Sequence, residues 1–215
     1  MLFVAQSMKK RIPNLITLMR IVIAAMFFVT LLGYQYPDHG RVWGNIAIGL
    51  FILGAFTDFI DGYLARKWDV VSLFGRIMDP FCDKVLIIGA FICFAGPRFI
   101  IPESNGEYAI VMATGVYPWM VILLIARELL VTAIRDVLES RGYSGGAKWA
   151  GKLKMIVQSV AIPAILLITV NLNPNENSEW LYTNQCLVWL VIIITLWSGI
   201  PYVTGLVKVM RQNNV

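Results

Sequence analysis

Four aspartates form the part of this sequence with the clearest capacity for chemistry. They are Asp58, Asp61, Asp79 and Asp83, in a chain whose residues are 58% hydrophobic. Asp58 and Asp61 are three residues apart, and Asp79 and Asp83 are four apart, so each pair lies on one face of a helix. The short segment between the pairs lets two neighbouring helices direct all four carboxylates at a common centre.

Ionised carboxylates in so apolar a chain need compensation, because a charge at membrane depth is costly without a cation or a water-filled cavity. Carboxylate oxygens suit hard divalent cations such as Mg²⁺ or Mn²⁺. We therefore predict that Asp58, Asp61 and Asp79 ligate metal and that Asp83 also contacts it. The structural alternative is a salt-bridge cluster. Its available partners are Arg66, Lys67, Arg76 and Lys84.

The residues between the aspartates extend this pattern. The full spacing from Asp58 to Asp83 is D-x2-D-G-x2-A-R-x8-G-x3-D-x3-D. It resembles the signature of the CDP-alcohol phosphotransferases at every fixed position. Members of that family are integral membrane enzymes that move a substituted phosphate from a CDP-linked donor to an alcohol and release CMP. The resemblance implies two Mg²⁺ or Mn²⁺ ions, a general-base role for Asp83 toward the acceptor hydroxyl, and a homodimer.

The same resemblance implies a site for the CDP-linked donor, expected to be CDP-diacylglycerol. Gly62 and Gly75 lack a Cβ, so a nucleotide can pack closely against helix backbone, and Ala65 fits the same requirement. Arg66 offers a planar donor fork to the diphosphate, and Asp61 faces the same site. For the glycines alone, the alternative is helix–helix packing.

A second polar face precedes the signature. Asn14, Thr17 and Arg20 recur at intervals of three residues and so share one face of a helix. This pattern is often seen at the start of these phosphotransferases, and we expect the face to contact the nucleotide or to support the acidic cluster. The alternative is a helix cap followed by an interfacial arginine.

Long apolar blocks set the fold class. A bilayer-spanning helix needs about 20 mostly apolar residues. Six blocks approach this length: 16–33, 42–64, 73–95, 116–138, 153–170 and 187–207. We therefore predict an all-α integral membrane protein, a six-helix transmembrane bundle forming one domain over residues 1–215.

The N-terminal residues 1–14 are expected to form a separate, short interfacial helix. Pro13 is expected to break it from the first span, and Asn14 is a plausible N-cap for that span. The charges follow the first apolar residues instead of preceding them, which favours a retained N-terminus over a signal peptide. Met1 and Met8 are both possible starts.

The net charge of +5 is distributed unevenly along the chain. If the N-terminus is cytoplasmic, most cations fall on the cytoplasmic side. These are Lys9, Lys10, Arg11, Arg66, Lys67, Arg76, Arg141, Lys148, Lys152, Lys154, Lys208 and Arg211. This asymmetry predicts both termini in the cytoplasm, with the active site facing it. The family resemblance implies that the membrane is the inner membrane of a bacterium. No basic run is interleaved with aromatic residues as in a nucleic-acid-binding module, and none is expected to bind nucleic acid.

A cluster of cations suits a phosphorylated acceptor. Arg127 and Arg135 are two helical turns apart, and three lysines follow at the start of the next span; they are Lys148, Lys152 and Lys154. The stretches Arg127-Glu128-x2-Val131-x3-Arg135 and Gly151-Lys152-x-Lys154 resemble bacterial family members that use glycerol 3-phosphate as acceptor. The alternative is internal pairing, of Arg127 with Glu128 or Asp136 and of Arg135 with Glu139.

Three functions other than transfer of a phosphatidyl group to glycerol 3-phosphate stay open at this point. The nearest is another family member that uses serine, inositol phosphate or a second phosphatidylglycerol as acceptor. A divalent-cation channel or transporter would explain the carboxylates, but it would not explain Gly62, Ala65, Arg66 and Gly75 at fixed gaps. A non-catalytic scaffold would leave a costly acidic cluster without a ligand.

Overall fold

The computed structural model describes the backbone of residues 2–37, 39–68, 73–101, 110–142, 148–172 and 179–212. Side chains are described within these ranges except at 2–14, 16, 59–68, 73–77, 79, 148 and 212. The helices are α1 (Leu2–Leu32), α2 (Arg41–Trp68), α3 (Leu73–Phe94), η1 (Pro97–Phe99), α4 (Pro118–Ser140), α5 (Lys148–Asn171), α6 (Glu179–Trp197) and α7 (Ile200–Gln212). Extended pairing within the described ranges is limited to two isolated bridges. The all-α prediction is therefore confirmed.

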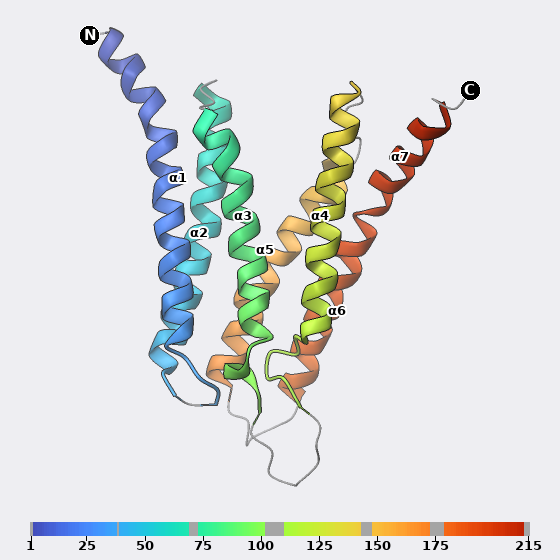
Figure 1. The fold of residues 1–215 in the computed structure, drawn as a ribbon. Helices are drawn as coiled ribbons and strands as arrows, with labels where there is room; N and C mark the ends of the chain where they lie inside the picture. Colours follow the sequence, from blue (N-terminus) through green and yellow to red (C-terminus); the bar gives the residue numbers. More distant parts are fainter. Residues whose placement is uncertain are drawn as a thin grey trace.

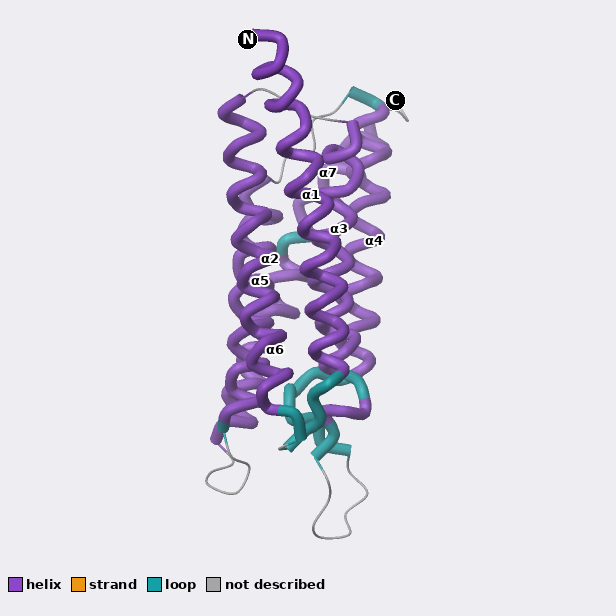
Figure 2. The backbone as a smooth tube through the Cα atoms, turned by 90° about the vertical axis from the view of Figure 1, so that its left-hand side faces the viewer, coloured by secondary structure: helices purple, strands orange, loops and turns teal. Residues whose placement is uncertain are grey.

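The helices run back and forth along one bundle (Figure 1). The start of α1 and the end of α7 lie at the same end of it, which we call the terminal end. The end of α2, the start of α3, the end of α4 and the start of α5 also lie there, and a view turned by 90° shows the helices following a common direction (Figure 2). The positions predicted to carry the cytoplasmic cations are therefore gathered toward one end of the molecule.

The predicted boundary between an N-terminal interfacial helix and the first span is wrong. Residues 2–32 form one continuous helix of 31 residues, so Pro13 does not separate an interfacial helix from the first span and Asn14 is not an N-cap. A proline removes one backbone hydrogen bond and bends a helix, but in a membrane bundle neighbouring groups can satisfy the freed carbonyl. Pro80 in α3 and Pro163 in α5 likewise lie inside helices that continue past them.

The last expected span, 187–207, is also divided. Helix α6 ends at Trp197, and α7 begins at Ile200 after Ser198 and Gly199. Pro201 explains the division, because its ring would collide with the carbonyl of Trp197 in a continuous helix, while a proline is tolerated in the first turn of a new one. This junction matters for the site, because Ser198 contacts an arginine of α4.

Close helix approaches build the core. Helix α1 packs against α2 and α3, α2 against α5, and α5 against α6, while α4 packs against α7. A Cβ on Gly44 of α2 would lie 2.7 Å from the Val170 side chain of α5, and one on Gly89 of α3 would lie 2.4 Å from the Phe28 ring of α1. Both glycines therefore let two helices pack more closely than any larger residue would allow.

Helix α4 carries most of the polar site, and local signals set its ends. It begins with Pro118 directly after the extended Tyr117, where the missing N–H of proline costs nothing. It ends at Ser140, and Gly142 follows with a φ of +78° and donates its N–H to the Glu139 carbonyl over 3.0 Å. This left-handed glycine closes the helix and satisfies a terminal carbonyl.

Two stretches of the described chain are long and apolar enough to cross a membrane. They are Trp149–Asn171 and Glu179–Arg211, each with a mean hydropathy of 2.1 over its most apolar window. A shorter apolar helical stretch covers Thr17–Leu32. These lengths agree with a membrane protein.

Candidate functional site

A buried arginine joins a predicted metal ligand, Asp58, to the predicted base, Asp83. Arg20 of α1 is only 1% exposed. Its Nη2 lies 2.9 Å from Oδ1 of Asp58 on α2, and its Nη1 lies 3.6 Å from Oδ1 of Asp83 on α3. One guanidinium therefore brings carboxylates of two neighbouring helices together, as the spacing of the acidic motif predicts.

These carboxylates are still accessible on one side. The Asp58 and Asp83 side chains are 35% and 27% exposed, while the guanidinium between them is buried. The arrangement agrees with the expectation that the face of Thr17 and Arg20 supports the acidic cluster. Thr17, one turn before Arg20, is fully buried.

The rest of the predicted metal and nucleotide sites lies outside the described side chains. This applies to Asn14, Asp61, Gly62, Ala65, Arg66, Gly75 and Asp79. Within the described part of the chain, no three His, Cys, Asp or Glu side chains form a group that could hold a metal ion. The donors that are described, two partly exposed carboxylates beside one another, are of the type that hard divalent cations prefer.

A cavity of about 710 Å³ connects Asp83 with the predicted acceptor cations. Helices α3, α4, α5 and α7 contribute to its wall. Its polar lining consists of Asp83, Lys84, Arg127, Glu128, Thr132, Arg135, Asp136, Glu139, Lys152, Lys154, Gln158 and Tyr202. Four of the five predicted acceptor cations are thus in one cavity with the predicted base, and the fifth, Lys148, has a side chain outside the described set.

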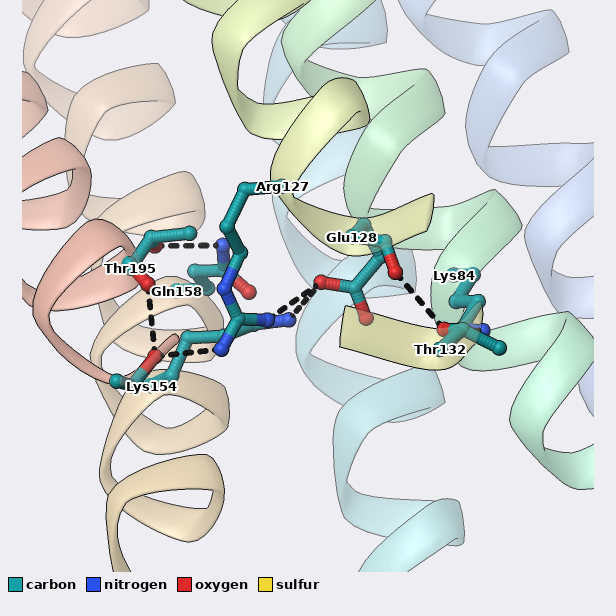
Figure 3. A network of polar contacts seen from close by, with 8 residues as sticks. Lys84, Arg127, Glu128, Thr132, Lys154, Gln158 and Thr195 are labelled. Atoms are coloured by element: carbon teal, nitrogen blue, oxygen red, sulfur yellow. Dashed lines mark hydrogen bonds and ion pairs between the residues drawn. The ribbon is translucent and has the colours of Figure 1, made fainter. Parts of the chain in front are cut away.

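Glu128 is the centre of a buried network in this cavity (Figure 3). Its Oε2 lies 3.0 Å from Nη1 of Arg127 and also pairs with Nζ of Lys154. Arg127 and Lys154 are only 8% and 7% exposed. The predicted alternative in which Arg127 pairs with Glu128 is therefore confirmed, and one carboxylate partly neutralises two of the acceptor cations.

The α6–α7 junction holds the other side of Arg127. Its Nη2 donates to Oγ of Ser198 over 2.7 Å, and that hydroxyl donates to the Thr195 carbonyl over 2.8 Å. A Cβ on Gly199 would lie 3.6 Å from Nε of Arg127, so the junction packs directly on the guanidinium. The break between α6 and α7 thereby fixes one cation of the cavity wall.

The sequence did not predict Lys84, Thr132 or Gln158 as site residues, although all three line this cavity. Lys84 donates from Nζ to Oγ1 of Thr132 over 2.8 Å, and Gln158 donates from Nε2 to Oγ1 of Thr195 over 3.2 Å. Spacing could have identified them. Lys84 directly follows Asp83, while Thr132 and Gln158 each lie one helical turn after a network residue, Glu128 and Lys154 respectively.

Arg135 and Lys152 complete the cationic lining and differ from the buried pair. Both side chains are exposed, and neither forms an ion pair in the part of the chain that the structure describes. The alternative in which Arg135 pairs with Glu139 does not occur among the described side chains. The cavity therefore combines a carboxylate able to accept a proton with cations able to hold an anion, which suits a hydroxyl compound that carries a phosphate.

The network predicts a stability effect for Glu128→Gln. The amide keeps the shape of the carboxylate but not its charge, so Arg127 and Lys154 would face each other in a buried setting without their shared anion. A hydrogen bond to a charged group contributes about 1.5–3 kcal/mol, and we expect a loss of this size in the free energy of unfolding. Thermal unfolding of the purified protein would measure it.

Glu139→Gln is the matched control, because Glu139 is on the same helix and exposed, without an ion pair among the described residues. It should unfold within about 0.5 kcal/mol of the unaltered chain. Equal stability of the two variants would show that the Glu128 contacts are not structural.

The sequence is similar to known proteins over most of its length. The family model described as CDP-alcohol phosphatidyltransferase matches residues 10–197. A Bacillus subtilis protein named CDP-diacylglycerol–glycerol-3-phosphate 3-phosphatidyltransferase is 31% identical over 216 residues, covering 94% of this chain and 98% of the relative. An Escherichia coli K12 protein of the same name is 32% identical over 201 residues, covering 92% and 96%.

Proposed function

Because this chain belongs to the CDP-alcohol phosphatidyltransferase family, we propose that it transfers the phosphatidyl group of CDP-diacylglycerol to sn-glycerol 3-phosphate. The products are phosphatidylglycerol phosphate and CMP, and the reaction is a step in phospholipid biosynthesis. The observation that supports this acceptor best is the single cavity containing both Asp83 and the cations Arg127, Arg135, Lys152 and Lys154. Relatives that carry the name of this activity, each matched over nearly its full length, add to that support.

The proposed reaction needs one proton acceptor and one leaving group. Asp83 takes the proton of the acceptor hydroxyl, whose oxygen forms a bond to the phosphatidyl phosphorus. The bond from that phosphorus to the bridging oxygen of the donor diphosphate breaks, and CMP leaves with the electron pair. Arg20 orients Asp83, since its guanidinium lies 3.6 Å from the Asp83 carboxylate.

Divalent cations fit the described carboxylates. We assign Asp58 and Asp83, together with Asp61 and Asp79, as ligands of two Mg²⁺ or Mn²⁺ ions. When bound, such ions neutralise the donor diphosphate and polarise its phosphorus for attack. Thr17, Gly62, Ala65, Arg66 and Gly75 are proposed to hold the donor nucleotide, with Asn14 beside them.

The membrane arrangement is part of the proposal. Helices α1 to α5 and the α6–α7 pair would give six crossings by one domain, residues 1–215, with the terminal end facing the cytoplasm of the inner membrane. Arg135 and Lys152 belong to the last turns of α4 and the first turns of α5, which meet at that end. A soluble acceptor would then enter from the cytoplasm while the acyl chains of the donor stay in the bilayer. We propose a homodimer, as the family resemblance implies.

An acceptor panel tests this proposal. CMP release would be measured with purified full-length protein, CDP-diacylglycerol and Mg²⁺, adding glycerol 3-phosphate, serine, inositol 1-phosphate or phosphatidylglycerol singly. Release with glycerol 3-phosphate alone is expected. CMP release with a different acceptor would support CDP-diacylglycerol as the donor and rule out glycerol 3-phosphate as the acceptor. Uptake of Mn²⁺ into protein-containing liposomes without CMP release would favour a transporter instead.

A further inference from the structure

The cations of the cavity fall into two groups that differ in their partners. Arg127 and Lys154 are buried and share the Glu128 carboxylate. Lys84, Arg135 and Lys152 line the same cavity and have no acidic partner within ion-pair distance among the described side chains. The charge of the second group is therefore unshared among the described side chains and available for an anion that enters from solution, whereas the first group keeps a net charge of +1 with Glu128.

Lys84 is the most constrained member of this second group. It is half-buried on α3, directly after Asp83, and its ammonium lies 2.8 Å from Oγ1 of Thr132 on α4. The Thr132 hydroxyl donates in turn to the Glu128 carbonyl over 2.8 Å, which leaves its oxygen lone pairs to accept from Lys84. The contact holds the ammonium in place without neutralising it.

The Lys84 ammonium has hydrogen-bond donors left for a ligand. Lysine offers three N–H donors, and the described contacts use one of them. A half-buried charge without a counter-ion is unfavourable, whereas an anion in the cavity would compensate it. The strong hydrogen bonds between ammonium groups and phosphate oxygens make a phosphate monoester the best-matched class.

We propose that Lys84 is a binding residue for the acceptor phosphate and that Thr132 is its positioning residue. This inference rests on the proposed function for the identity of the acceptor. Asp83 and Lys84 line the same cavity, so one small molecule can place its hydroxyl at the carboxylate and its phosphate at the ammonium. Arg135 and Lys152 complete the anion site.

The proposal changes the role of the buried pair. Because Arg127 and Lys154 are already held by Glu128, and Arg127 also by Ser198, they form the wall that shapes the site. They contribute a net charge of +1 with Glu128 and do not need to contact the phosphate. The phosphate contacts come from the three cations whose charge is not shared.

Lys84→Met tests the assignment, with Lys84→Arg as the conservative variant and Lys208→Met as the matched control. Lys208 is an exposed lysine of α7 that does not line the cavity. For each purified full-length protein, two quantities would be measured. The first is KM for glycerol 3-phosphate and for CDP-diacylglycerol in CMP release, and the second is calorimetric binding of glycerol 3-phosphate without donor.

The expected result is a KM for glycerol 3-phosphate and a Kd each raised about tenfold or more in Lys84→Met, with KM for CDP-diacylglycerol unchanged. Lys84→Arg should recover most of the affinity, Lys208→Met should match the unaltered chain, and Thr132→Val should weaken binding by a smaller factor. A merely structural role would change the unfolding temperature without this split between the two substrates.

Three outcomes would overturn the assignment. One is unchanged glycerol 3-phosphate affinity in Lys84→Met. Another is a raised KM for CDP-diacylglycerol alone, which would move Lys84 to the donor diphosphate. The third is equal loss of binding in Lys208→Met. If the unaltered chain bound glycerol 3-phosphate through Lys84 but released no CMP with it, the proposed function would fail while the phosphate site stood.

Discussion

Asp83→Asn is expected to lower kcat for CMP release by at least about a hundredfold. The amide has nearly the shape of the carboxylate but cannot take a proton from the acceptor hydroxyl, and a general base contributes about 10²–10⁴-fold to a rate. Loss of charge also removes one of the anions that Arg20 contacts. Initial rates at saturating donor and acceptor would measure the effect.

Two further measurements are needed to interpret this result. Binding of Mn²⁺ should survive in Asp83→Asn, because the other three aspartates of the motif remain. Glu179→Gln makes a similar carboxylate-to-amide change at an exposed residue that starts α6, at the other end of the bundle, and should leave kcat within about twofold. A fully active Asp83→Asn would remove the base role.

Arg20→Met should have the second large effect, on stability and on activity together. Removing the buried guanidinium leaves the Asp58 and Asp83 carboxylates close together without their shared cation. Breaking a buried charge pair by removal of one partner costs about 3–5 kcal/mol. We expect a loss near the lower end of this range, because both carboxylates are partly exposed, and a CMP release rate reduced more than tenfold.

Arg20→Lys distinguishes the effect of the positive charge from the effect of the planar guanidinium shape. Lysine restores the positive charge but not the planar fork that reaches carboxylates on α2 and α3 at once, so it should recover part of the stability. Arg141→Met, at an exposed arginine just after α4, is the control for loss of a cation and should change stability by less than about 0.5 kcal/mol. An Arg20→Met protein as stable as the unaltered chain would show that this bridge does not hold the three helices together.

The parts of the fold that the sequence predicts well are those that depend on local composition. Apolar length predicts helices at α2, α3, α4 and α5 within a few residues, because a spanning helix needs a minimum apolar run. The errors lie at prolines. Pro13 suggests a boundary that α1 does not have, whereas Pro201 marks a real division that apolar length alone conceals. Whether a proline breaks a helix depends on tertiary neighbours, which a single sequence does not contain.

The candidate site shows the same limit. Spacing predicts that Asp58 and Asp83 come together and that Arg127, Arg135, Lys152 and Lys154 share a region, since helical periodicity fixes which residues share a face. It does not distinguish cations that are neutralised from cations that are available. That distinction depends on Glu128 reaching across from α4 to α5, and on Ser198 at a helix junction that apolar length does not indicate. The role of Lys84 follows only from these contacts.

The most direct test of the central claim is transfer of labelled glycerol 3-phosphate into lipid. Purified protein would be incubated with CDP-diacylglycerol, Mg²⁺ and labelled glycerol 3-phosphate in mixed micelles, and the lipid extract would be identified by mass spectrometry. We expect labelled phosphatidylglycerol phosphate to form in a one-to-one ratio with CMP and to be absent without the donor. CMP release with no label in the lipid extract would contradict it.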